Sequence, residues 1–115
     1  MVQEKIYNMS FEKVYTLLIQ KVQRKGKSKK EADDLIMWLT GYQDIDELCN
    51  SNISYGEFID KASFNPACIN IKGTICGVKI EEIEDPFMKK VRYLDKLIDE
   101  LSKGKDVQKI INKYK

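Results

Sequence analysis

The sequence predicts an all-α, or mainly α, protein: a single compact domain of about five or six helices over residues 1–115. Three observations predict this fold. A chain of 115 residues has the usual length of one domain, and 43% hydrophobic residues are enough for a core without disulfides. Apolar residues recur at helical spacing in several segments. Most of those segments begin at a capping residue and end at glycine or proline.

The first two predicted helices form a hairpin. The first begins at the N-cap Ser10 and ends at Gly26. The second begins with a capping box made by Ser28 and Glu31, and it ends at Gly41. Because the link between them is short, we expect an antiparallel or crossed pair. Their inward faces are Phe11, Val14, Tyr15, Leu18 and Val22, and then Ala32, Leu35, Ile36 and Leu39.

Two shorter helices are predicted over residues 44–50 and 54–62. Asp44 and Ser54 suit their N-caps, and a glutamate follows each of them three residues later. The second helix ends before Pro66, because a residue that precedes proline disfavours the helical region. The residues expected to face inward are Ile45, Leu48, Cys49, Tyr55, Phe58, Ile59 and Ala62.

Residues 67–83 allow two interpretations. The β-branched residues in this stretch, with a turn at Lys72-Gly73, predict a minor β-hairpin near residues 69–80. The end of the stretch, residues 80–83, could instead form a helical turn, because short apolar runs do not separate strand from helix. The β-branched residues are Ile69, Ile71, Ile75, Val78 and Ile80.

A long helix is predicted from the N-cap Asp85, with Pro86 in its first turn, to Gly104. Its apolar stripe repeats at spacings of three and four residues through Phe87, Val91, Leu94, Ile98 and Leu101. The stripe is wide, which favours core packing over a dimer formed along a narrow seam. A last amphipathic helix follows the cap Asp106.

Charge is unevenly distributed along the chain. Residues 1–30 carry a net charge of +6, whereas residues 31–60 contain no basic residue and carry −8. The dense basic turn comprises Lys21, Arg24, Lys25, Lys27, Lys29 and Lys30. It could bind the phosphates of a nucleic acid. The scarcity of arginine and the acidic segment that follows favour solvated lysines between two helices instead.

The sequence lacks most of the residues that catalysis uses. It has no histidine, which excludes Ser-His and Cys-His nucleophile pairs and histidine-ligated zinc. Its three cysteines, Cys49, Cys68 and Cys76, have no metal-binding spacing, and we expect them to be small buried side chains. We therefore expect no metal and no cofactor. The remaining enzymatic candidates are Cys76, which lies between two glycines, and the carboxylates Glu81, Glu82, Glu84 and Asp85.

Two pairs of residues are the candidates for a binding surface. Trp38 and Tyr42 are four residues apart and flank the apolar face of the second helix, where they could form an aromatic ledge. The edge of the core is the structural alternative. Arg92 and Asp95 lie on the polar flank of the long helix and could pair with each other or serve the same site.

Two parts of the chain resemble a known bacterial family. The resemblance is carried by motifs within residues 9–42 and 71–111, whereas residues 43–70 match loosely. The motifs are MSFEKVY, RKGKSKKE, WLTGY, KGTICGVKIEEIEDP and VRYLDKLIDELSKGK. Together they resemble the family of domains of unknown function numbered 2200. Thr16 stands where that family commonly has a proline. The resemblance implies a bacterial, cytoplasmic, mainly helical single domain, and it implies no activity, substrate or catalytic residue.

These observations favour a non-catalytic binding or protein-interaction module whose partner is unknown. A homo-oligomer or a protein partner fits the opposed charge blocks. Nucleic-acid binding through residues 21–30 is the alternative, and a small enzyme is the second. No apolar run approaches the length of a membrane span, and the first residues lack a signal-peptide pattern, so we expect a cytoplasmic protein without a membrane segment.

Overall fold

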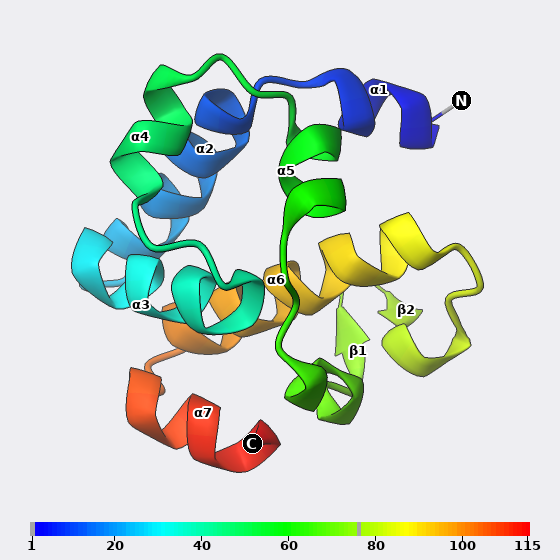
Figure 1. Cartoon of the computed structure of the whole chain (residues 1–115). Coiled ribbons are helices and arrows are strands. Elements are labelled where there is room, and N and C mark those ends of the chain that lie inside the picture. The colour runs from blue at the N-terminus through cyan, green and yellow to red at the C-terminus, as the bar shows by residue number, and fades with distance from the viewer. Residues whose placement is uncertain (1, 76) are drawn as a thin grey trace.

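Helices carry nearly all of the regular structure in the computed structural model, which describes residues 2–75 and 77–115 (Figure 1). The fold class predicted from the sequence is confirmed. The described α-helices are α1 (Val2–Asn8), α2 (Phe11–Gln23), α3 (Lys29–Thr40), α4 (Ile45–Asn50), α5 (Tyr55–Lys61), α6 (Pro86–Ser102) and α7 (Val107–Tyr114). The shorter elements are the 3₁₀ turns η1 (Pro66–Asn70) and η2 (Ile80–Glu82) and the strands β1 (Thr74–Ile75) and β2 (Val78–Lys79).

The predicted caps form in the structure. The Ser28 hydroxyl accepts a hydrogen bond from the Glu31 backbone N–H, and the Glu31 carboxylate accepts from the Ser28 N–H, which completes the capping box of α3. Asp44, Ser54 and Asp106 cap α4, α5 and α7 in the same way. Each side chain accepts a hydrogen bond from the backbone N–H of the residue three positions later. These local bonds explain why the starts of the helices can be predicted from the sequence.

Helix α1 is an addition to the predicted elements and raises the number of described α-helices to seven, above the predicted five or six. It packs beside α5, at the top of the view in Figure 1. A seven-residue helix is marginal by itself, so tertiary contacts must hold it. The chain after it is anchored by two backbone hydrogen bonds, from Phe11 N–H to the Ile53 carbonyl and from Tyr55 N–H to the Met9 carbonyl.

The minor hairpin is present but shorter than predicted. Strands β1 and β2 are antiparallel, with Thr74 opposite Lys79 and Ile75 opposite Val78. The turn predicted at Lys72-Gly73 is wrong, because this dipeptide precedes β1. Residues 66–70 form the turn η1 instead of a strand, since Asn65 caps it through the Ala67 N–H. The helical turn considered for residues 80–83 appears as η2.

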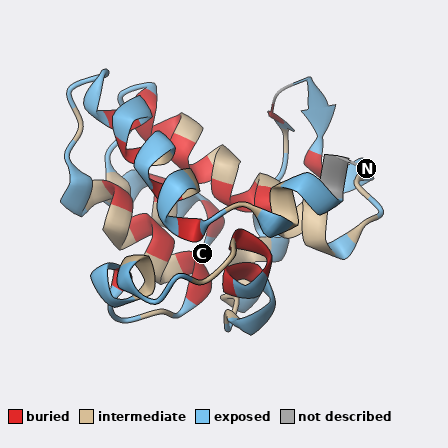
Figure 2. Cartoon of the chain, turned by 90° about the horizontal axis from the view of Figure 1, so that it is seen from above, coloured by how far each residue is buried: buried red, intermediate tan, exposed pale blue. Residues whose placement is uncertain are grey.

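The core is arranged around α6, which crosses the middle of the molecule and packs against α2, α3, α5, α7 and β1 (Figure 1). The stripe of α6 is buried within the single chain, with Leu94, Ile98 and Leu101 fully enclosed. This is the core packing that the wide stripe favoured, so the alternative of a dimer formed through the stripe is wrong. Figure 2 shows the buried positions on the inward faces of the helices. None of the described helices has the length and apolar character needed to cross a bilayer.

Candidate functional site

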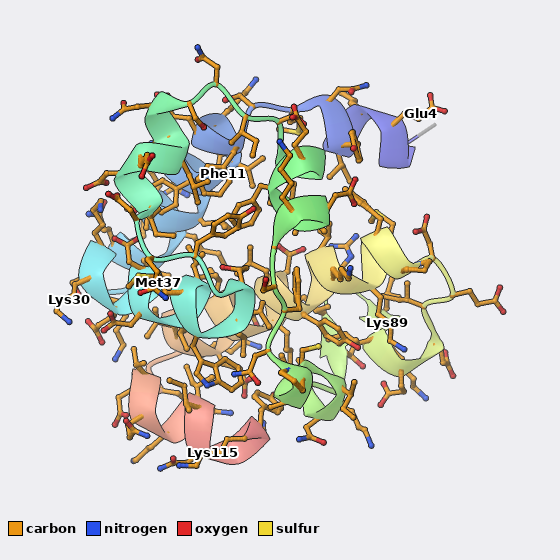
Figure 3. All side chains as sticks on the ribbon, viewed as in Figure 1. Glu4, Phe11, Lys30, Met37, Lys89 and Lys115 are labelled. Atoms are coloured by element: carbon orange, nitrogen blue, oxygen red, sulfur yellow. The ribbon has the colours of Figure 1, made fainter. Side chains whose placement is uncertain are left out.

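Half of the basic turn is paired with the acidic segment that follows it. Lys29 Nζ lies 2.8 Å from an oxygen of Asp33 on the same helix and 3.3 Å from an oxygen of Asp46 on α4. Lys30, which projects from the edge of the molecule in Figure 3, lies 3.2 Å from Asp34. The other ion pairs of this turn join Lys27 to Glu31 and Lys21 to Asp99 of α6. Three lysines of the basic turn and four carboxylates of the acidic segment therefore neutralise each other within the chain, which counts against two opposed charged faces.

Two members of the basic turn, Arg24 and Lys25, are exposed at the end of α2 and make no ion pair with another described residue. They are what remains of the phosphate-binding patch that the sequence suggested. Two adjacent cations on one turn provide much less than the six to ten phosphate contacts of a typical duplex-binding surface.

The predicted aromatic ledge is divided by the end of α3. Gly41 adopts the left-handed conformation with φ +79°, and this ends the helix before Tyr42. The Tyr42 ring stacks on Phe58 of α5, with 5.0 Å between ring centroids, and its hydroxyl donates to the Phe58 carbonyl at 2.8 Å. Burial raises the pKa of Tyr42. Trp38 stays on α3, where its side chain is half-buried against the core.

A hollow of about 320 Å³ opens beside Tyr42. Its lining comes from the α3–α4 link and from α4, and comprises Tyr42, Gln43, Asp44, Glu47, Leu48 and Ser51. We call it the Tyr42 hollow. Asp44 caps α4 with one carboxylate oxygen, 3.0 Å from the Glu47 N–H. Neither Asp44 nor Glu47 pairs with a cation of the described part of the chain. The site thus combines an aromatic wall, an aliphatic side chain and two uncompensated carboxylates.

Arg92 and Asp95 are paired, as the sequence suggested, with 3.1 Å between guanidinium and carboxylate. Neither residue lines the Tyr42 hollow. Burial raises the pKa of Asp95 even though Arg92 favours the charged form. The structure adds a neighbour that sequence reasoning missed, the Tyr55 hydroxyl of α5, which is buried and has no hydrogen-bond partner among the described residues. Burial and the charge of Asp95 raise the pKa of Tyr55. A tyrosine on an inward helical face was the signal that could have indicated it.

A second hollow, of about 340 Å³, lies between α1 and α6 and is lined by Glu4, Tyr7, Asn8 and Phe87. Tyr7 forms its centre, with its ring centroid 5.4 Å from that of Phe87. The lining is mostly uncharged, so it suggests no particular ligand chemistry. We regard this hollow as the edge of the surface on which α1 docks.

Glu100 is a buried carboxylate that sequence reasoning also missed. It is 3% exposed and accepts hydrogen bonds from Lys105 at 2.8 Å, Lys113 at 2.9 Å and the Tyr114 hydroxyl at 2.6 Å. Burial alone would raise the pKa of Glu100, but these three hydrogen bonds outweigh it and hold the pKa below its usual value. The cluster joins α6 to α7, and its complete pairing indicates a structural role.

The carboxylates among the enzymatic candidates gain no support from their surroundings. Cys76 lies outside the described residues. Glu81, Glu82 and Glu84 are exposed, and Asp85 caps α6 by accepting from the Phe87 and Met88 N–H groups. Within residues 2–75 and 77–115, no three side chains of the metal-binding types gather closely enough to hold an ion.

The two described cysteines are half-buried, not buried as expected. Burial raises the pKa values of Cys49 and Cys68, which disfavours the reactive thiolate in both.

Comparison with known proteins places these features in a family. The model of a family described as "Uncharacterized protein conserved in bacteria (DUF2200)" matches residues 5–112. A solved structure titled "Crystal structure of uncharacterized protein SP1917" superposes with a TM-score of 0.93 and 46% sequence identity, covering 96% of this chain and 93% of that chain. The comparison with curated proteins finds no match.

Proposed function

The chain belongs to the DUF2200 family of uncharacterized bacterial proteins, and we propose that it is a non-catalytic binding or protein-interaction module. The observation that carries this proposal is the Tyr42 hollow, which combines a rigid aromatic wall with uncompensated charge. Concave sites with an apolar lining and a few convergent polar groups are the usual form of ligand sites.

The way in which the ionisable groups are used supports a module without catalysis. Glu100, the buried carboxylate among the described residues, already accepts hydrogen bonds from three donors that join α6 to α7. The Tyr15 hydroxyl donates to Asp33, and burial raises the pKa of Tyr15, so this phenol stays protonated at neutral pH. These perturbed groups hold helices together, as structural networks commonly do.

Nucleic-acid binding is the second candidate, and the exposed, unpaired side chains of Arg24 and Lys25 are the observation that favours it. The ion pairs of the other four residues of the basic turn count against it. We also propose a cytoplasmic location. Two free thiols, Cys49 and Cys68, support it because cysteines stay reduced in that compartment.

Nuclear magnetic resonance of the ¹⁵N-labelled chain tests the proposed function. A library of small fragments and short peptides is screened, and we expect the backbone shift changes to gather over residues 42–51. The variant Gln43→Trp fills the hollow from its exposed lining and should abolish those changes. Gln20→Trp, at an exposed position on α2 outside the hollow, is the matched control and should retain them.

Two outcomes would contradict the proposal. Shift changes that avoid residues 42–51 with every fragment and peptide would remove the hollow as the site. Changes centred on Arg24 and Lys25 with a nonspecific DNA duplex, weakening steeply as salt rises, would favour the nucleic-acid alternative.

A further inference from the structure

We propose that the Tyr42 hollow binds the ammonium group of a lysine side chain presented by a partner protein. This inference rests on the proposed binding function and adds the chemistry of the ligand. It is argued from three properties of the described residues: the charges left unpaired, the apolar wall next to them, and the number of carboxylates.

The charge of the hollow is negative and uncompensated. Lys29 is the cation that reaches α4, and it is already held by Asp33 and Asp46. Asp44 and Glu47, which line the hollow, have no such partner among residues 2–75 and 77–115. A cationic group that entered the hollow would therefore meet two carboxylates without displacing an internal ion pair.

The apolar part of the lining suits the stem of a long side chain. Tyr42 cannot rotate freely, because its ring stacks on Phe58 and its hydroxyl is bound to the Phe58 carbonyl at 2.8 Å. Tyr42 and Leu48 thus form a preorganised wall against which methylene groups can pack while the charged end reaches the carboxylates. The wall also offers an aromatic ring to the cation.

The geometry favours an ammonium group over the other cations. A hard metal ion would need more oxygen ligands, and no described cluster of three acidic, histidine or cysteine side chains exists. A guanidinium prefers both oxygens of one carboxylate, and Asp44 does not offer them because one of its oxygens is bonded to the Glu47 N–H. A guanidinium held by Glu47 would leave Asp44 unused. An ammonium is a compact charge that can donate to single oxygens of two residues. A free diamine would bring a second charge for which the lining holds no further carboxylate.

The test is a titration of the ¹⁵N-labelled chain with three probes: acetyl-Gly-Lys-Gly-amide, the same peptide with Nε-acetyl-lysine, and 1,5-diaminopentane. The lysine peptide should shift the signals of residues 42–51 and bind at least about tenfold more tightly than the acetylated peptide, which lacks the charge. Its binding should weaken as salt rises.

Three variants assign the effect to the carboxylates. Asp44→Asn keeps the capping of α4, because asparagine caps as well as aspartate, and should weaken the lysine peptide about threefold. Glu47→Gln should weaken it to a similar extent. Glu12→Gln removes an exposed carboxylate of α2 outside the hollow and should leave the affinity unchanged.

The outcomes separate this inference from the proposed function. Equal binding of the acetylated peptide in the hollow would overturn the lysine assignment and leave the binding module intact. Tighter binding of 1,5-diaminopentane than of the lysine peptide would also overturn it, in favour of a free amine. Absence of shifts with both peptides would overturn it as well, while the fragment screen decides separately on the binding function.

Discussion

Two buried tyrosine hydroxyls of this protein differ in whether they have a hydrogen-bond partner. The Tyr55 hydroxyl has none among the described side chains, whereas the Tyr114 hydroxyl donates to Glu100 at 2.6 Å. An unpaired buried hydroxyl lowers stability because it has lost its water, and a paired one does not. The same residue type therefore contributes with opposite sign at the two positions.

Tyr55→Phe should raise the free energy of unfolding by about 1 kcal/mol, because the orphan hydroxyl is removed and the ring stays. Tyr114→Phe, the matched control, should lower it by about 2 kcal/mol, because a hydrogen bond to a charged group is lost. Urea denaturation measures both values. A loss of stability in Tyr55→Phe would show that this hydroxyl has a partner, such as an internal water molecule near Arg92 and Asp95.

The lowered pKa of Glu100 predicts a stability that depends on pH. Below its folded-state pKa the carboxyl is protonated in both states, so its contribution is absent. Above its ordinary value of 4.5 in the unfolded chain, the contribution is fully present. The unfolding midpoint of the wild type should therefore fall as pH drops below about 5. Glu100→Gln should be less stable at neutral pH and show a shallower fall, and an unchanged acid slope would contradict this assignment.

Among the elements, α1 docks on α5 through a close contact between Tyr7 and Gly56. The Tyr7 ring lies where a side chain at Gly56 would project, so a methyl group there would overlap the ring carbons. The Tyr7 hydroxyl donates to Asp60 at 2.8 Å, one turn further along α5. Gly56 is therefore needed because its missing side chain leaves room for the Tyr7 ring of α1, and not because it makes α5 flexible.

Gly56→Ala tests this contact, because its expected effect on stability is opposite to that of most glycine-to-alanine substitutions in helices. Glycine to alanine within a helix normally stabilises by about 1 kcal/mol, but here the methyl group collides with Tyr7 and should destabilise by about 2 kcal/mol. In the Tyr7→Ala background, where the ring is absent, Gly56→Ala should instead be neutral or stabilising by up to about 1 kcal/mol. Urea denaturation and hydrogen exchange of α1 provide the measurements. A stabilising effect of Gly56→Ala in the wild-type background would mean that Tyr7 does not occupy this position.

At the scale of the whole molecule, the charge blocks act as internal partners. Lys21 of α2 forms an ion pair with Asp99 of α6 at 3.3 Å, although the two residues are 78 positions apart in the chain. Asp99 also forms an ion pair with Lys103. Burial would raise the pKa of Asp99, but the two lysines hold it below its usual value. The net charge of +2 therefore conceals a pattern in which opposite charges meet across the fold.

Lys21→Gln and Lys25→Gln form a matched pair that measures this effect. Lys21→Gln should lower the free energy of unfolding by up to about 1 kcal/mol, because an exposed ion pair between two helices is lost. Lys25→Gln, which removes an exposed lysine without an ion pair, should change it by less than about 0.5 kcal/mol. Equal losses in urea denaturation would mean that the Lys21–Asp99 pair contributes nothing beyond general charge.

The candidate site could be foreseen only in part. The spacing of Tyr42 from Trp38 predicts that both lie on one face of the same helix. In the structure α3 ends at Gly41, so Tyr42 lies outside that helix. The hollow beside Tyr42 depends on the position of α4, which packs against α2 and is joined to α3 by the Lys29–Asp46 pair; no local pattern contains that position. The pairing of Arg92 with Asp95 was predictable because both lie on one helix.

By itself, the sequence determined the helices from α2 to α7, since their caps and apolar stripes are interactions among residues within a few positions of one another. Tertiary structure alone decided that α1 is a helix and that Tyr7 covers Gly56. It also decided that, among residues 2–75 and 77–115, Tyr55 finds no hydrogen-bond partner and Asp44 and Glu47 find no cation. The physical reason is distance along the chain. Each of these features depends on which side chains from separate elements meet, and short-range periodicity carries no information about those meetings.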